Sequence, residues 1–226
     1  MGPIEKFDVL ITGAARGIGK QIADDLTAKG HRAQTPSRLI LDLSDIDSIK
    51  NFLLVNGDDP VDVLILNAGQ NYPQSLEEME IRNWDETQMV NATSSLLLIQ
   101  HYAPKMAARG YGRIVAISSA YASRARFGRS AYSASKATLE AIVRSVAIEF
   151  ADKGVIANCV SPGFALTDLT RQNNNESQIS DLASKIPLKR LADPSEISYW
   201  VQALASIENT YVTGQTINVD GGMSCI

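Results

Sequence analysis

The chain has 226 residues, of which 45% are hydrophobic, and this is enough to build one buried core. The net charge is −4, and acids and bases are scattered, so nothing indicates nucleic acid or a membrane surface as a partner. No apolar run is long enough to cross a bilayer, and the first residues lack the apolar core of a signal peptide. Cys159 and Cys225 are far apart in sequence, so we expect no disulfide framework and a reducing, cytoplasmic location.

Short apolar runs and helical patterns alternate along the whole chain. In chain order, strands are predicted at residues 7–12, 31–36, 39–43, 61–66, 112–118, 155–160 and 215–219. The segment 31–36 is the weakest of these because it contains little apolar material. Helices are predicted at residues 18–29, from a cap at Ser44 or Asp45 onward, at 84–108 and at 131–151. Gly30 and Gly110 stand where the first and third of these helices should stop.

Several predicted strands are apolar almost throughout, which is typical of strands covered on both faces by helices. Together with the alternation of strands and helices, this predicts an α/β fold with a doubly wound parallel sheet. No internal repeat or linker divides the chain, so we expect a single domain. The least patterned stretch, about residues 162–190, is predicted to be a substrate loop, with a plain surface excursion as the alternative.

The first predicted strand leads directly into Thr12-Gly-Ala-Ala-Arg-Gly-Ile-Gly19, where the first helix begins. Glycines allow a tight turn and a close approach of the backbone to a ligand, and a helix N-terminus offers free N–H groups to a pyrophosphate. Residues 1–226 are therefore expected to form one dinucleotide-binding domain of Rossmann type. The alternative is a structural turn that binds no ligand.

Several motifs occur in the order and at the spacing of one known family. They are Gly13, Gly17 and Gly19, Asn67-Ala-Gly69, Asn91, Ser119, Tyr132-Ser-Ala-Ser-Lys136, Pro162-Gly163 with Thr167, and Val219-Asp-Gly-Gly222. Over nearly its whole length the chain therefore resembles the short-chain dehydrogenase/reductase family. The segments 186–190 and 193–196 resemble members of the 3-oxoacyl carrier-protein reductase type, although members with unrelated substrates share them.

The resemblance implies an NAD(P)-dependent oxidoreductase that reduces a ketone, or oxidises the alcohol, by hydride transfer. Tyr132 would be the general acid in reduction and the general base in oxidation. Lys136, one helical turn further along the same face, would lower the pKa of Tyr132 and bind the nicotinamide ribose. Ser119 would orient the substrate oxygen. Asn91 would hold a water that relays protons, with a purely helix-stabilising role as the alternative.

The cofactor preference is expected to be set after the weak strand at 31–36, where an acidic residue favours NAD and a basic one NADP. No acid stands there, and Arg38, assisted by Arg16, is a candidate clamp for a 2′-phosphate, so NADP(H) is favoured over NAD(H). Either arginine is alternatively an ordinary solvated side chain. The helix that the family has between its second and third strands is missing, because Arg38 is followed at once by the strand predicted at 39–43.

The resemblance assigns a larger set of residues to the cofactor. They are Gly13, Arg16, Gly17, Ile18, Gly19, Arg38, Asp42, Leu43, Asn67, Ala68, Gly69, Tyr132, Lys136, Pro162, Gly163 and Thr167. Within this set, Asp42 and Leu43 match the position that contacts adenine. No cluster of residues has metal-ligand spacing, so we expect no metal.

The sequence says less about the substrate. Arg124, Arg126 and Arg129 would attract an anionic or carrier-linked carbonyl or alcohol substrate, with solvated loop charges or subunit contacts as the alternative. A 3-oxoacyl thioester reductase, a keto-sugar or polysaccharide-precursor reductase and an alcohol dehydrogenase all fit. In another class, the chain would be a non-catalytic, cofactor-binding regulatory protein. The helices at 85–108 and 131–151 resemble the family's oligomer-forming pair, which implies a homodimer or homotetramer.

Overall fold

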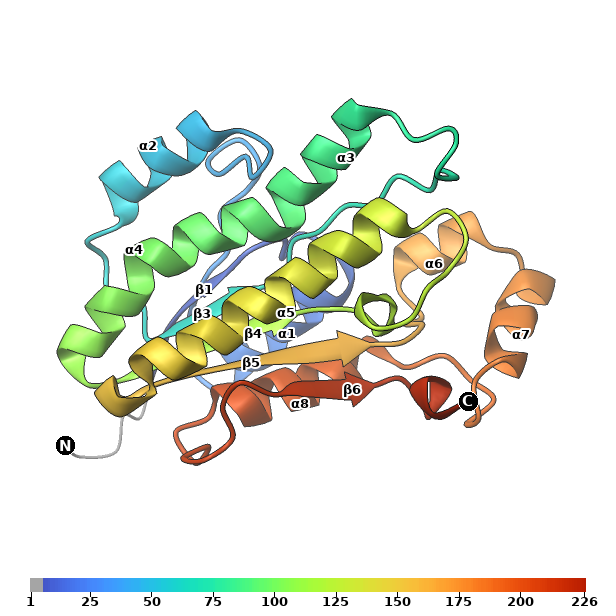
Figure 1. Cartoon of the computed structure of the whole chain (residues 1–226). Coiled ribbons are helices and arrows are strands. Elements are labelled where there is room, and N and C mark those ends of the chain that lie inside the picture. Colours follow the sequence, from blue (N-terminus) through green and yellow to red (C-terminus); the bar gives the residue numbers. More distant parts are fainter. Residues whose placement is uncertain (1–5) are drawn as a thin grey trace.

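The computed structural model describes residues 6–226, apart from the side chains of Leu169 and Asn173, and contains a parallel sheet with helices on both faces (Figure 1). Residues 1–5 of the predicted domain lie outside this described part. The strands are β1 (Asp8–Ile11), β2 (Arg32–Gln34), β3 (Val63–Leu66), β4 (Gly112–Ile117), β5 (Val155–Pro162) and β6 (Thr216–Val219). Their order is β2-β1-β3-β4-β5-β6 and all pairs are parallel, which confirms the predicted doubly wound α/β fold.

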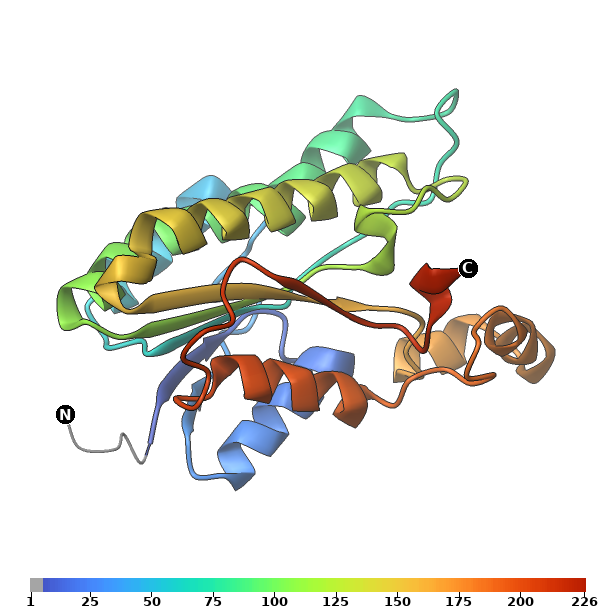
Figure 2. The same ribbon diagram turned by 60° about the horizontal axis from the view of Figure 1, so that its bottom comes forward.

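Helices cover the two faces of the sheet in separate groups (Figure 2). One face carries α2 (Ile46–Asn56), α4 (Ser94–Arg109) and α5 (Ser130–Phe150), and the other carries α1 (Gly17–Ala28) and α8 (Pro194–Ala205). Alternate residues of β3 enter the two apolar clusters: Leu64 and Leu66 pack on the α2, α4 and α5 side, while Val63 and Ile65 pack on the α1 and α8 side. This double covering explains why the strand is apolar at every position.

Residues 39–43 do not form the predicted strand, and this expectation was wrong. The backbone turns back on itself here, since the amides of Ile40 and Leu41 both donate to the carbonyl of Ser37 at 2.9 Å. A parallel neighbour for β2 needs a crossover of about a dozen residues or more, and only residues 35–38 separate β2 from residue 39. The loss of the helix after β2 therefore removes the strand beyond it as well, and β2 becomes an edge strand.

The segment after Pro162, predicted as a loop, contains two helices, α6 (Asp168–Asn173) and α7 (Glu176–Ser184). They stand beyond the carboxyl ends of the strands (Figure 1). The sequence reading also missed α8, which begins with a capping box between Asp193 and Glu196 and has Pro194 in its first turn. No helix in the described part is long and apolar enough to cross a membrane.

The turn at residues 37–41 and a strand at the same place would respond differently to substitution. In a strand, Leu39 and Leu41 would share one face, whereas here Leu41 is buried and Leu39 is 99% exposed. We expect Leu41→Ala to lower the free energy of unfolding by about 2–4 kcal/mol and Leu39→Ala to change it by less than about 0.5 kcal/mol. Urea unfolding of both variants measures the difference, and equal losses would contradict the turn.

Candidate active site

The glycine turn after β1 packs directly against the loop that follows β3. A Cβ atom on Gly13 would lie 2.8 Å from the Cα of Ala68, and one on Gly19 would lie 2.3 Å from Nδ2 of Asn67. That amide group donates to the carbonyls of Thr12 at 3.1 Å and Gly13 at 2.9 Å. The two loops therefore fit together only because the glycines carry no side chain, and any other residue at these positions would push them apart.

The N-terminus of α1 is open to a ligand. Arg16 is the capping residue but makes no side-chain capping bond, and the first turn of α1 contains no acidic residue. The free N–H groups and the positive end of the helix dipole are suited to a pyrophosphate. Across the turn, a Cβ atom on Gly17 would lie 3.4 Å from Cγ2 of Thr167, so the start of α6 closes the other side. This cradle fits the phosphates of a dinucleotide.

Arg38 and Asp42 lie together at the predicted adenosine end. Nε of Arg38 is 3.0 Å from Oδ2 of Asp42, and a terminal nitrogen of Arg38 donates to Oγ of Ser44 at 3.3 Å. Hydrogen bonds from Ser44, and then from Arg38, hold the pKa of Asp42 below its ordinary value. The Arg38 side chain is 75% exposed, so part of its guanidinium faces solvent. The structure thus places two predicted cofactor residues in one pair, with Leu43 beside them.

The ammonium of Lys136 is buried where α5 crosses the end of β4. Its Nζ donates to the carbonyl of Ile117 at 2.7 Å, and burial lowers the pKa of Lys136 to about 8. A Cβ atom on Gly69 would lie 3.3 Å from this Nζ, so the absence of a side chain there keeps the ammonium accessible. Of its three N–H donors, one has an acceptor within residues 6–226. The remaining donors fit the hydroxyls of a ribose.

Tyr132 and Ser119 meet beside this ammonium. The Nζ of Lys136 is 5.8 Å from the centroid of the Tyr132 ring. Burial raises the pKa of Tyr132, and a hydrogen bond with Ser119 and the guanidinium of Arg129 oppose the rise. Oγ of Ser119 also accepts the backbone N–H of Tyr121 at 3.2 Å. A raised pKa keeps the phenol protonated at neutral pH, and the influence of Lys136 on that pKa stays a prediction.

A π-helical turn, Met89–Thr93, interrupts the helix between α3 (Ile81–Gln88) and α4 and carries Asn91 at its centre. Such turns are frequent at functional sites. Asn91 is fully buried, and its side chain accepts the N–H of Gln70 at 2.8 Å and donates to the Gln70 carbonyl and to Oγ of Ser135, each at 2.9 Å. It therefore ties the loop after Asn67-Ala-Gly69 to α5. Its predicted water-holding role stays a prediction.

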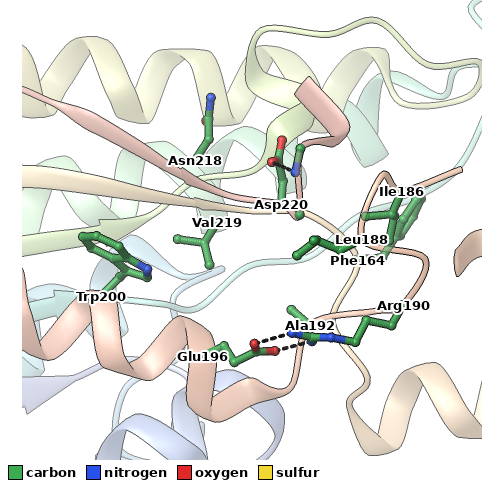
Figure 3. A pocket seen from close by; sticks show the side chains of 12 residues that line it. Phe164, Ile186, Leu188, Arg190, Ala192, Glu196, Trp200, Asn218, Val219 and Asp220 are labelled. Carbon is green, nitrogen blue, oxygen red and sulfur yellow. Dashed lines mark hydrogen bonds and ion pairs between the residues drawn. The ribbon is translucent and has the colours of Figure 1, made fainter. Parts of the chain in front are cut away.

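Two cavities lie near the carboxyl ends of β5 and β6. The first, of about 230 Å³, lies between α8 and β6, with Trp200 and Leu188 on opposite sides (Figure 3). The charged groups that line it are paired: Arg190 binds Glu196 through two bonds of 2.7 Å, and Asp220 accepts two backbone N–H groups. The second, of about 480 Å³, opens beside Tyr121 and shares Phe164 with the first. It is the cavity nearer to Ser119 along the chain.

Comparisons with known proteins agree with this geometry. The family model described as enoyl-(acyl carrier protein) reductase matches residues 13–224. A 3-oxoacyl-(acyl-carrier-protein) reductase FabG of Buchnera aphidicola subsp. Schizaphis graminum is 38% identical, over 97% of this chain and 98% of that protein. The chain belongs to the short-chain dehydrogenase/reductase family.

Two solved structures are also similar. One, described as a short chain dehydrogenase/reductase family protein, has a TM-score of 0.86 at 31% identity and covers 97% of this chain and 98% of its own. The other, a proposed NAD(P)-dependent gluconate 5-dehydrogenase of Beutenbergia cavernae with bound NADP, has a TM-score of 0.88 at 28% identity and covers 100% and 98%. The chain is accordingly an NAD(P)-dependent oxidoreductase that acts on C=O or CH–OH groups.

Some residues that shape this candidate site were not predicted from the sequence. Oε1 of Glu140 accepts a hydrogen bond from Oγ of Ser118 at 2.5 Å, which ties the end of β4 to α5 next to Ser119. The spacing of Glu140 could have indicated its place in the site. It stands one helical turn after Lys136, on the face of α5 that also carries Tyr132. Pro162 and Gly163 are among the predicted cofactor residues, and β5 ends at Pro162. Gly163 packs closely against Asp220, because a Cβ atom on Gly163 would lie 2.9 Å from the Cα of Asp220.

The low pKa of Lys136 predicts how stability changes with pH. The folded chain releases this proton at about pH 8, whereas the unfolded chain keeps it to about 10.5. Between these values the unfolded state binds more protons, so raising the pH favours the folded state. Relative to Lys136→Met, the free energy of unfolding of the unsubstituted chain should rise by about 3 kcal/mol from pH 7.5 to 10.5. Urea unfolding tests this, and a pH-independent difference would contradict it.

Proposed function

We propose that the chain is an NADPH-dependent reductase of 3-oxo groups, with a 3-oxoacyl thioester as its substrate class. The observation that carries this proposal is the meeting of Tyr132, Ser119 and Lys136 at the carboxyl end of β4. The FabG protein of Buchnera aphidicola, named a 3-oxoacyl-(acyl-carrier-protein) reductase, supports the substrate class and a carrier-linked substrate. Arg38 beside Asp42, and the NADP in the Beutenbergia structure, support the cofactor.

The proposed mechanism assigns one task to each side chain. A bound nicotinamide supplies the hydride. The Ser119 hydroxyl, whose oxygen is occupied by the Tyr121 amide, donates its hydrogen toward the substrate oxygen as negative charge develops there. Tyr132, which is protonated at neutral pH, gives its phenolic proton to that oxygen, and Ser119 and Arg129 ease this transfer by opposing the rise that burial causes in its pKa. The ammonium of Lys136 stabilises the tyrosinate that remains.

A keto-sugar acid is the second candidate substrate. The proposed gluconate 5-dehydrogenase of Beutenbergia cavernae covers this whole chain, and Arg124 and Arg126 line the cavity beside Tyr121. A purely regulatory, cofactor-binding protein would have no need of Ser119, Tyr132 and Lys136 together.

The oligomeric state and the cellular compartment of the enzyme are also proposals. We infer a homodimer or homotetramer formed through α4 and α5, on which Leu96 and Ile148 are exposed apolar side chains. Cys159 and Cys225 are both free, which supports a reducing cytoplasm as the compartment.

Substrate and mechanism are tested together by following the loss of NADPH absorbance with 3-oxoacyl thioesters, keto sugars and simple ketones. We expect the highest kcat/KM for a 3-oxoacyl thioester. Tyr132→Phe should lower kcat by about 10²-fold or more while NADPH still binds, because the proton donor is lost and the cradle is intact. Turnover by this variant at the level of the unsubstituted chain would refute the mechanism.

The cofactor preference is tested by Arg38→Gln. A hydrogen bond to a charged group contributes about 1.5–3 kcal/mol, so KM for NADPH should rise about tenfold or more while KM for NADH stays within about twofold. Arg32→Gln is the matched control. Arg32 is also an exposed arginine paired with an aspartate, Asp8, but it stands at the start of β2, whereas Arg38 follows the end of that strand. Equal use of NADH and NADPH before the substitution would overturn the preference.

A further inference from the structure

A cavity lies beside Tyr121 and extends to the C-terminal segment. Tyr121 stands two residues after Ser119 and is bonded to its hydroxyl through the backbone. The cavity measures about 480 Å³, a size that holds a small organic molecule, and Tyr121 and Phe164 form aromatic walls. Met223 and Ile226 close it from the C-terminal side. Because Tyr121 both lines the cavity and contacts Ser119, we take this space as the place for the remaining part of a substrate whose carbonyl lies at Ser119.

The charged side chains that line this cavity are all positive: Arg124, Arg126 and Lys185. Within residues 6–226, no Asp or Glu carboxylate forms an ion pair with any of them. Arg129 adds a fourth positive charge nearby, and its pKa is lowered by burial and then by the charge of Arg126. Like charges gathered without an Asp or Glu partner repel one another and attract an anion.

Arg124 is already occupied by the protein. Its two terminal nitrogens donate to the main-chain oxygens of Met223 and Ile226, which holds the C-terminal segment in place as a wall of the cavity. This arginine is therefore a structural clamp, and its removal would disturb the cavity itself.

Arg126 is held in place but retains free donors. One of its terminal nitrogens donates to the hydroxyl of Tyr121, and its guanidinium lies 5.3 Å from the centroid of the Tyr121 ring and 5.5 Å from that of Phe164. Contact with two aromatic faces fixes the position of a guanidinium without neutralising its charge. For its other N–H groups, the described part of the chain provides no acceptor. Such a group is prepared to bind a carboxylate or phosphate through two parallel bonds.

We propose that this cavity binds an anionic group, a carboxylate or a phosphate, on the substrate whose carbonyl is reduced at Tyr132. Arg126 is the principal ligand of that group, and Lys185, which follows α7, adds a second positive charge from the substrate-loop segment. The inference rests on the proposed function, because it places the anion on the same substrate molecule. It narrows the substrates to ketones that carry a negative charge away from the reacting carbon.

Matched pairs of substrates test this with the full chain and NADPH. The first pair is 4-oxopentanoate and its methyl ester, and the second is acetoacetyl-coenzyme A and acetoacetyl-N-acetylcysteamine. Each pair shares a ketone and differs in charge, so the first tests a carboxylate and the second a phosphate. In one pair, kcat/KM for the anionic member should exceed that for the neutral member by about tenfold or more.

Arg126→Met should lower that ratio to below about threefold, since the ligand of the anion is gone. Lys153→Met is the matched control, because Lys153 also lies over an aromatic ring, that of Phe150, but beyond the C-terminal end of α5. This control should leave the ratio unchanged. Equal use of both members of each pair by the unsubstituted chain, or a ratio that survives in Arg126→Met, would overturn the inference.

A binding measurement separates the failure of this inference from the failure of the proposed function. With NADP⁺ saturating, glutarate or phenyl phosphate should raise the thermal midpoint of the unsubstituted chain and leave that of Arg126→Met unchanged. No shift with either compound, or an equal shift in both proteins, would overturn the anion site. Absence of turnover with every substrate, neutral members included, would overturn the proposed function while leaving the binding result to decide the site.

Discussion

Lys136 keeps an ammonium inside the protein, and among the described residues the Ile117 carbonyl is its one hydrogen-bond acceptor. A buried charge is costly unless hydrogen bonds surround it, and the lowered pKa of Lys136 expresses that cost. The rest of the site is built around this group: Gly69 leaves it accessible, and Asn91 and Glu140 tie the neighbouring loop and strand to α5. A ribose hydroxyl would complete its hydrogen bonding, and the proposed function assigns both cofactor binding and catalysis to this ammonium.

The sheet could be predicted because burial on both faces leaves a direct trace in the sequence, as in the unbroken apolar run of β3. The strand expected at residues 39–43 shows where such patterns fail. An apolar run reports a tendency to be buried, but the chain between β2 and residue 39 is too short for a parallel crossover. The helices α6 and α7 were missed because they are short, six and nine residues, and the apolar face of α7 consists of Ile179, Leu182 and Ala183 alone.

The candidate catalytic residues could be named as a set because their spacing matches a family, and the structure brings Ser119, Tyr132 and Lys136 together, while their catalytic roles stay a proposal. The sequence could not distinguish the three arginines between Ser119 and Tyr132. In the fold they occupy three environments: Arg124 clamps main-chain oxygens, Arg126 lies against two aromatic rings, and Arg129 acts on the pKa of Tyr132. These differences arise from contacts with Phe164 and the C-terminal segment, which are distant in sequence.

Transfer of deuterium from cofactor to substrate tests the central claim most directly. The chain would be incubated with NADPH carrying deuterium at both hydrogen positions of the reactive nicotinamide carbon and with a 3-oxoacyl thioester, and the product alcohol would be analysed by mass spectrometry. The account predicts one deuterium on the carbinol carbon, because Tyr132, Ser119 and Lys136 are placed to protonate and orient the oxygen of that same group. Tight binding of the cofactor without deuterium in any product, across thioesters and keto acids alike, would contradict it.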